Sequence, residues 1–237
     1  MKVYVDDMLV KSTTIEHHLQ DLKETFFDLR LYNMKLNPDK CTFGMEAEKF
    51  LGFMVSRRGI EANPEKVRAI LEMSSPKSVK YIQKLTGRIV ALHRFISRAV
   101  DKCLPFFKIL RQTARFTWDD KCNDVFQALK KYMVSPPHLV SPTPGEILYM
   151  YLAASDETLA AVLLKEVSRK QLPVYYVSKA LHLSELNYNK IEKLAYTLIM
   201  ASRKLRQYFQ SHHIVILTDQ PIKEILQKMS SSGRMIK

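Results

Sequence analysis

The chain has 237 residues, of which 46% are hydrophobic and 26% charged, so its composition is that of a folded globular protein rather than a disordered one. Its formal net charge of +13 points to a polyanion or an acidic surface as partner, with simple solubility as the alternative explanation. No apolar run is long enough to cross a bilayer, and no signal peptide is recognisable. The three cysteines lack the spacing of a zinc site or a disulfide framework. We therefore expect an intracellular protein without a membrane partner.

A hairpin and a helix are predicted at the start of the chain. Residues 3–5 and 8–10 are short β-favouring runs, and Asp6 and Asp7 between them predict a tight turn. The apolar residues from Ile15 to Leu29 recur at helical spacing behind a cluster of Ser and Thr that can cap the helix.

A basic helical pattern occupies the middle of the chain. It follows a predicted strand at residues 50–55, begins at Ser74-Ser75-Pro76, and repeats apolar residues from Ile82 to Ile96, as one helix or two near-continuous ones. Residues 76–131 contain 13 Lys or Arg and 4 Asp or Glu, so 13 − 4 gives a local charge of +9. Mixed signs are usual on a merely solvated helix face, so this face favours nucleic acid. Its cations are Lys77, Lys80, Lys84, Arg88, Arg94, Arg98 and Lys102.

A linker at residues 141–145, rich in Pro, Ser and Gly, precedes a different pattern. Strands in hairpin order, then a long helix and another strand, predict a mixed sheet packed by helices. The predicted strands are residues 147–152, 159–164, 174–177 and 214–217, and the helix is residues 184–209.

The adjacent carboxylates of Asp6 and Asp7 allow two explanations. Neighbouring Asp residues in a turn are usually turn formers, because their side chains satisfy local backbone donors. Alternatively, they hold Mg²⁺, which takes one or two carboxylates together with substrate phosphates in phosphoryl transfer.

A series of motifs decides between these explanations by resemblance. Tyr4-Val5-Asp6-Asp7 resembles the catalytic hairpin of gypsy-type, plant-like LTR retrotransposon reverse transcriptases. Phe50-Leu51-Gly52-Phe53 resembles the primer-grip hairpin of that family, and residues 82–88 resemble its thumb. Residues 174–181 and 217–220 resemble its ribonuclease H domain. The resemblance covers essentially the whole chain.

The resemblance implies an α+β fold in four parts. These are the C-terminal palm at residues 1–58, a helical thumb at 59–115, a connection at 116–142, and a mixed α/β RNase H-like domain, degenerate and truncated, at 143–237. It also implies roles for single residues. Asp6 and Asp7 would hold the catalytic Mg²⁺ or Mn²⁺, and Lys40 would be a general acid, unless it is an ordinary surface lysine. Contacts to primer and nucleic acid are implied for Tyr4, Leu51, Gly52, Lys77, Lys80, Lys84, Arg88 and Arg94.

The ribonuclease H resemblance is incomplete at the catalytic positions. The first and second expected carboxylates fall on Ala153 and Leu194, and Asp219 is the matching carboxylate that remains. Glu192 lies two residues before Leu194, about 200° away around a helix, and so cannot replace the missing carboxylate. An apolar Leu at this position suggests that the site has become core.

We therefore expect part of an RNA-directed DNA polymerase that binds an RNA or DNA primer–template but is inactive alone. The third polymerase Asp and the fingers would lie upstream in the polyprotein, with a second RNase H and an integrase as possible downstream neighbours. A non-catalytic structural or nucleic-acid-binding remnant of a transposon polyprotein is the alternative. An active ribonuclease is disfavoured by Ala153 and Leu194.

Overall fold

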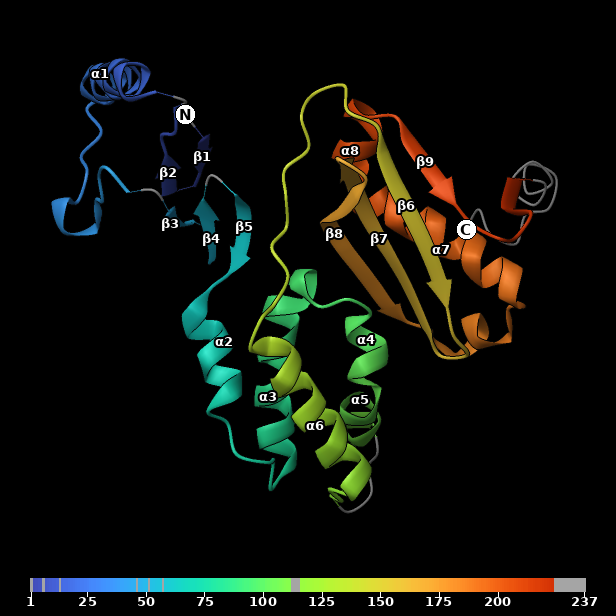
Figure 1. The fold of residues 1–237 in the computed structure, drawn as a ribbon. Helices are drawn as coiled ribbons and strands as arrows, with labels where there is room; N and C mark the ends of the chain where they lie inside the picture. The colour runs from blue at the N-terminus through green and yellow to red at the C-terminus, as the bar shows by residue number, and fades with distance from the viewer. Residues whose placement is uncertain are drawn as a thin grey trace. The chain divides into compact units, whose positions relative to one another are not determined.

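The computed structural model divides the chain into two compact units, Met1–Arg57 and Arg58–Lys237 (Figure 1). It describes residues 2–223 apart from 6, 13, 46, 51, 57 and 112–115, and leaves undescribed the side chains of residues 2, 4, 47, 48, 111 and 183. Both units combine helices and strands, which confirms the α+β class.

The first unit begins with the predicted hairpin. Strand β1 (Lys2–Tyr4) pairs antiparallel with β2 (Asp7–Leu9), and Tyr4 stands opposite Asp7. Val5 has a φ of 52°, in the left-handed region that two-residue hairpin turns use. Asp7 therefore belongs to the second strand, which corrects its expected place between the strands.

Helix α1 (Ile15–Leu31) follows, as the apolar spacing predicts. The Thr14 side chain accepts a hydrogen bond from the His17 N–H at 3.3 Å, so the polar residues before the helix do supply its N-cap. Of the side chains described in residues 2–56, only those of Thr25 and Leu29 are buried.

A short 3₁₀ turn, η1 (Pro38–Lys40), leads to a second hairpin, β3 (Ala47–Phe50) and β4 (Phe53–Ser56). The prediction of a single strand at residues 50–55 is therefore wrong. The chain reverses at Gly52, whose φ of 76° is readily adopted only by a residue without a Cβ atom.

The second unit opens with a strand and several helices (Figure 1). They are β5 (Gly59–Ala62), α2 (Pro64–Leu71), α3 (Val79–Leu92), the 3₁₀ turn η2 (His93–Phe95), α4 (Ala99–Lys102), α5 (Leu104–Arg111) and α6 (Asp120–Met133). On α3 the predicted apolar positions Ile82, Leu85 and Ile89 are buried.

The helix α3 begins later than predicted, and the basic pattern is divided between separate helices, which was one of the two predicted alternatives. It begins at Val79 rather than at Ser74-Ser75-Pro76, because Ser78 is extended, with a φ of −158° and a ψ of 164°. It ends at Leu92, and the left-handed Arg98, with a φ of 53°, separates it from α4. The basic residues after Leu92 therefore leave the face that the helical wheel assigned to them.

A close backbone approach joins the start of the second unit to the segment after α6. The Ile60 N–H donates to the Leu139 carbonyl at 2.8 Å, and the Leu139 N–H donates to the Ile60 carbonyl at 3.0 Å. A Cβ atom at Gly59 would lie 2.1 Å from the Leu139 carbonyl oxygen. Only glycine fits there, so Gly59 permits this crossing.

The mixed sheet contains β6 (Leu148–Ala154), β7 (Thr158–Val167), β8 (Lys170–Ala180) and β9 (Ile214–Leu217). Their order is β8-β7-β6-β9, with β6 and β9 parallel and the other neighbours antiparallel. The prediction of three strands, a helix and a fourth strand is thus correct in order, although the strands that precede the helix are longer.

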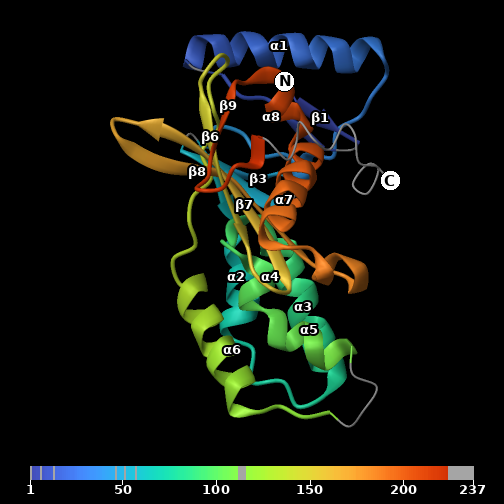
Figure 2. The same cartoon turned by 90° about the vertical axis from the view of Figure 1, so that its right-hand side faces the viewer.

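Helices cover one face of this sheet (Figure 2). The predicted helix at residues 184–209 is divided into the 3₁₀ turn η3 (Leu183–Asn187), α7 (Lys190–Lys204) and α8 (Arg206–Ser211). Ala201 of α7 is fully buried in one apolar cluster with Met150 of β6 and Leu163 of β7.

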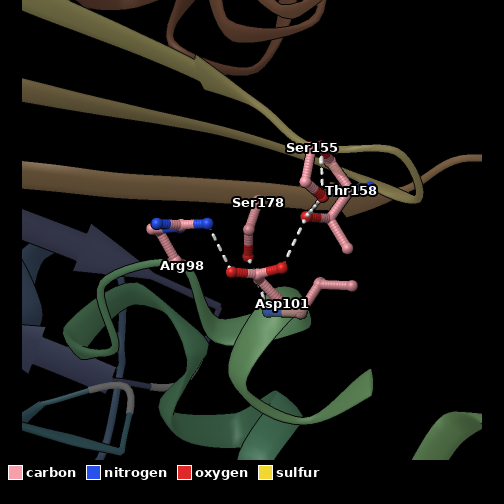
Figure 3. Close-up of polar contacts among 6 residues, drawn as sticks. Arg98, Asp101, Ser155, Thr158 and Ser178 are labelled. Carbon is pink, nitrogen blue, oxygen red and sulfur yellow. Dashed lines mark hydrogen bonds and ion pairs between the residues drawn. The ribbon is translucent and has the colours of Figure 1, made fainter. Parts of the chain in front are cut away.

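A side chain and a backbone N–H of α4 join the helical part to the hairpin end of the sheet (Figure 3). The Asp101 carboxylate pairs with the Arg98 guanidinium at 2.5 Å and accepts a hydrogen bond from the Thr158 hydroxyl at 3.2 Å. The Val100 N–H donates to the Ser178 hydroxyl oxygen at 3.3 Å. Helices and sheet are therefore packed together within the second unit.

Candidate functional site

Of the two candidate metal ligands, Asp6 and Asp7, the structure describes only Asp7. Asp7 is exposed at the first position of β2, next to the hairpin turn. Asp6 and the side chain of Tyr4 lie outside the described residues, so their roles stay predictions. The exposed Asp7 carboxylate suits Mg²⁺, which can take one protein carboxylate and complete its shell with water and phosphate oxygens.

The other residues of the first unit are also incompletely tested. Lys40 is exposed at the end of η1, and nothing in its surroundings identifies it as a general acid. Leu51 lies outside the described residues, whereas Gly52 is the hairpin turn glycine. The turn accounts for Gly52 without a nucleic acid, although it leaves the predicted primer contact open.

The predicted basic face divides into exposed and internally engaged cations. Lys77, Lys80 and Lys84 are exposed. The Arg88 guanidinium instead donates to the Ala69 carbonyl of α2. Arg94, in η2, lies over the ring of Tyr175 on β8, with its guanidinium carbon 4.7 Å from the ring centroid. Arg88 and Arg94 thus hold elements together, which a helical wheel does not reveal.

A glycine lies among the exposed lysines of α3 and was missed by the sequence reasoning. Gly87 is exposed in the helix interior, and a Cβ atom there would meet nothing within 4 Å. It lines a hollow of about 440 Å³ between α2 and α3, together with Lys84 and Arg88. Glycine in a helix interior costs roughly 0.5–1 kcal/mol relative to alanine, and internal packing does not require a glycine here. The signal that the sequence offered was therefore a glycine in the middle of a predicted helix.

The positions that the resemblance assigns to a ribonuclease H site bring together few metal ligands. The parallel pairing of Tyr151 with Leu217 places Ala153 and Asp219 each two residues beyond this pair, at the same edge of the sheet. Both are exposed. Leu194 is only 4% exposed and is packed with Ile222. The carboxylate of Asp219 therefore has alanine and a core leucine in place of its expected companions, and these residues do not fit a two-metal site.

The nearby carboxylates serve other contacts. The Glu192 carboxylate accepts a hydrogen bond from the Asn189 N–H at 2.9 Å, and the Asn189 side chain accepts one from the Glu192 N–H, also at 2.9 Å. This capping box fixes the start of α7. Glu157 pairs with Lys108 at 2.5 Å. Among the residues that the structure describes, no three His, Cys, Asp or Glu side chains gather as a metal site.

A polar triad joins β8, η3 and α7 at this end of the sheet. The Lys179 ammonium lies 2.7 Å from the Glu185 carboxylate, which also accepts a hydrogen bond from the Tyr196 hydroxyl at 2.6 Å. Burial by itself would raise the pKa of the Glu185 carboxyl. The hydrogen bonds from Lys179 and Tyr196, with one from a backbone N–H, outweigh burial and lower this pKa to about 2.

Two family models match separate parts of the chain. Residues 1–83 match the family described as reverse transcriptase (RNA-dependent DNA polymerase). Residues 118–216 match the RNase H-like domain found in reverse transcriptase. Within the described ranges, none of the helices combines the length and apolar character needed to span a membrane.

Several relatives match nearly the whole chain. The Pol polyprotein from transposon 297 of Drosophila melanogaster is 31% identical over 93% of this chain and 21% of its own length. The polyprotein from transposon 412 of the same organism is 27% identical over 98% of the chain and 19% of its own length. The transposon Tf2-3 polyprotein of Schizosaccharomyces pombe is 27% identical over 98% of the chain and 17% of its own length. The chain thus spans about a fifth of these relatives.

Solved structures agree on the fold. The foamy viral protease–reverse transcriptase in complex with double-stranded DNA has a TM-score of 0.76 and 21% identity, over 92% of this chain and 46% of that one. The same protein in complex with an RNA/DNA hybrid has a TM-score of 0.75 and 20% identity, over 95% of this chain and 30% of that one.

Proposed function

Because the chain carries a reverse transcriptase segment and an RNase H-like domain in the order found in transposon Pol polyproteins, we propose that it holds the primer–template duplex for a retrotransposon reverse transcriptase. The parent polyprotein would be an RNA-directed DNA polymerase. The Tyr4-Val5-Asp6-Asp7 sequence supports a gypsy-type element as its source. The solved relatives with bound double-stranded DNA and RNA/DNA hybrid support this choice of partner.

The exposed side of α3 is the observation that carries this proposal. Lys80 and Lys84 are exposed there beside Gly87, where no side chain covers the helix backbone. Lysine ammonium groups neutralise phosphates without reading sequence, and an open glycine allows a strand to approach the helix closely. The face therefore suits a duplex held by its backbone, whatever its sequence.

The hairpin with Asp7 would act at the primer end of that duplex. When bound, Mg²⁺ or Mn²⁺ would neutralise charge on the phosphates and favour displacement by the primer hydroxyl. Asp6 and Asp7 would hold the ion, and a further carboxylate would come from upstream in the polyprotein. A positioned lysine such as Lys40 could supply a proton to the leaving group.

The first unit offers a surface for the rest of the polyprotein. Its apolar side chains include Phe27 and Leu31, which lie one turn apart on α1 and are 66% and 61% exposed. Large apolar groups gathered on one small unit mark an interaction surface. We assign it to the upstream palm and fingers, which would also complete the carboxylate set.

A structural role for the RNase H-like domain is the second candidate. The burial of Leu194 supports it, because a core leucine now occupies a position where the family has a metal ligand. In this role the domain acts as a tether for the helical part, through the contacts of α4 with the sheet (Figure 3).

Duplex binding tests the principal proposal. Fluorescence anisotropy with a labelled primer–template should give an affinity whose logarithm falls linearly with the logarithm of salt concentration. The double variant Lys80→Gln/Lys84→Gln should weaken binding. It should also make the dependence of log affinity on log salt concentration shallower, by about 1 for each phosphate that is no longer neutralised. The double variant Lys170→Gln/Lys190→Gln removes the same charge from exposed positions on the sheet domain and should change binding much less. Equal effects of both variants would refute the assignment to α3.

Primer extension tests whether the chain can act alone. With Mg²⁺, primer–template and nucleoside triphosphates, the purified chain should give no template-dependent product, because under this proposal a further carboxylate comes from upstream in the polyprotein. Product that disappears in Asp7→Asn would contradict this expectation.

A further inference from the structure

Two stretches of the chain that lack acidic residues meet within the second unit. Residues 73–100 contain no Asp or Glu, and neither do residues 193–218. His93, in η2, belongs to the first stretch, and Lys204, the last residue of α7, belongs to the second. The His93 Nε2 and the Lys204 Nζ are 3.4 Å apart. The fold therefore brings basic groups from two distant segments to one place.

The hydrogen bonds of His93 define the protonation of its ring. A carbonyl oxygen can only accept, so Nδ1, which lies 2.6 Å from the Val90 carbonyl oxygen of α3, carries a proton and donates. An ammonium group can only donate, so Nε2 accepts from Lys204 and carries no proton. The ring is therefore neutral, with Nε2 directed at a cation.

The charged groups that act on His93 are cations. Burial is the principal cause that lowers the pKa of His93 below its ordinary value of 6.5. Lys204 from α7 and Arg94 from η2 lower this pKa further, and the backbone hydrogen bond opposes them. On the neighbouring elements β8 and α8, Tyr175 lies beneath the Arg94 guanidinium, and Arg94 lowers the pKa of Tyr208, which burial raises. A negative charge at this place would reverse the effect of the cations on His93.

The structure supplies no such negative charge at close range. Among the residues that it describes, no carboxylate lies within 4.0 Å of Lys204 or His93. Lys204 is exposed, as are Arg203 and Arg206 beside it in the sequence, and His93 is half-buried. Several exposed cations in succession suit the repeated charges of a polyanion better than a single small anion.

We propose that His93 and Lys204 together bind a phosphodiester of the nucleic-acid backbone, and that His93 takes up a proton when the phosphate binds. The proton comes from solvent and bonds to Nε2. The Nε2–H and the Lys204 ammonium then donate to the two non-bridging oxygens of one phosphate. This inference rests on the proposed function, that the chain holds a nucleic-acid duplex. Because η2 follows α3 directly, the contact lies at the C-terminal end of the helix that carries Lys80 and Lys84.

Duplex affinity should therefore depend on pH through His93. A bound phosphate favours the imidazolium, so the pKa of His93 is higher in the complex than in the free chain. Below the lower of these two pKa values the ring is charged in both states, and affinity is highest. Affinity falls as pH rises between the two values and is constant at its lowest above them.

Fluorescence anisotropy with a labelled primer–template measures this dependence between about pH 5.5 and about pH 8, where histidine changes its charge. We expect affinity to be at least about threefold higher at the lower pH, and most of this difference to be lost in His93→Gln. Glutamine keeps an N–H that can donate to the Val90 carbonyl, so the helix end is preserved. Calorimetry in two buffers with different heats of ionisation should show fewer protons taken up by His93→Gln than by the unsubstituted chain.

Lys204→Gln tests the second donor. It should weaken duplex binding at both ends of the pH range and make the dependence of log affinity on log salt concentration shallower by about 1. Lys190→Gln removes the same charge from an exposed position at the opposite end of α7 and should change binding much less. Circular dichroism melting confirms that each variant is folded.

Inorganic phosphate alone is the second probe, because a free anion could use the same two donors. Saturable binding of phosphate that both variants abolish, with unchanged duplex affinity, would assign these residues to a free anion and overturn the proposal. Equal pH dependence and proton uptake in His93→Gln and the unsubstituted chain would also overturn it, as would equal effects of Lys204→Gln and Lys190→Gln. If Lys80→Gln/Lys84→Gln still weakens binding in those cases, the proposed function stands without this contact. A chain that binds no duplex refutes both.

Discussion

At the scale of single residues, Gly87 and its neighbours show that some side chains of α3 stabilise the fold while others remain free to contact a partner. Arg88 is turned toward the Ala69 carbonyl, whereas Lys84 remains exposed. Gly87 lies between them with open space above its backbone. A residue that weakens the helix and fills no internal need is best explained by what approaches it from outside.

Gly87→Ala should separate these two effects. We expect the free energy of unfolding to rise by roughly 0.5–1 kcal/mol, because alanine is the better helix former. We expect duplex affinity to fall, and to fall further in Gly87→Leu, because a side chain then lies between helix and strand. Chemical denaturation and anisotropy measure the two quantities. Unchanged affinity in both variants would show that the duplex does not approach α3 at this position.

The triad of Lys179, Glu185 and Tyr196 shows how elements are held together at the end of the sheet. It connects β8, η3 and α7, where the apolar cluster of the sheet gives way to exposed residues. Because the pKa of Glu185 falls from its ordinary value of 4.5 to about 2, the ionised carboxylate stabilises the folded state.

Glu185→Gln should therefore destabilise the chain in a pH-dependent way. A lowered folded-state pKa gives stability that is complete above pH 4.5 and is lost as pH falls toward about 2. We expect a loss on the order of 1–3 kcal/mol at pH 7 that shrinks as the pH is lowered through this window. Denaturation curves of both proteins across this range measure it. A difference that is constant with pH would mean that the charge of Glu185 is not responsible.

At the scale of the whole molecule, the two units differ in how much core they contain. The second unit has fully buried side chains in both its helical part and its sheet, such as Phe106 and Leu148. The described part of the first unit buries only Thr25 and Leu29. Few buried apolar contacts mean low local stability.

Hydrogen exchange followed by mass spectrometry should reveal this difference in the intact chain. We expect amides of β7 to exchange at least about 100-fold more slowly than those of α1, which corresponds to roughly 3 kcal/mol of extra local stability. Adding the upstream palm and fingers in trans should slow exchange in α1. Equal protection of α1 and β7 in the isolated chain would contradict the difference in core.

The sequence by itself determined the elements whose signals are local. The helix from Ile15 has its apolar spacing and its Thr14 cap in one continuous stretch. The strand at residues 214–217 and the order of strands around the long helix also follow from short-range patterns. That Ala153 and Leu194 stand where two carboxylates are expected is a prediction from the resemblance, which needs only the side chains visible in the sequence.

Only the tertiary structure decided which charged side chains are available to a partner. Arg88 bonds to a carbonyl 19 positions earlier, and Arg94 stacks on Tyr175 of a distant strand. The burial of Leu194 beside Ile222 and the approach of Lys204 to His93 likewise depend on segments that only the fold brings together. Periodicity reports which side of its own helix a residue occupies, but the neighbour on that side is set by how the elements pack.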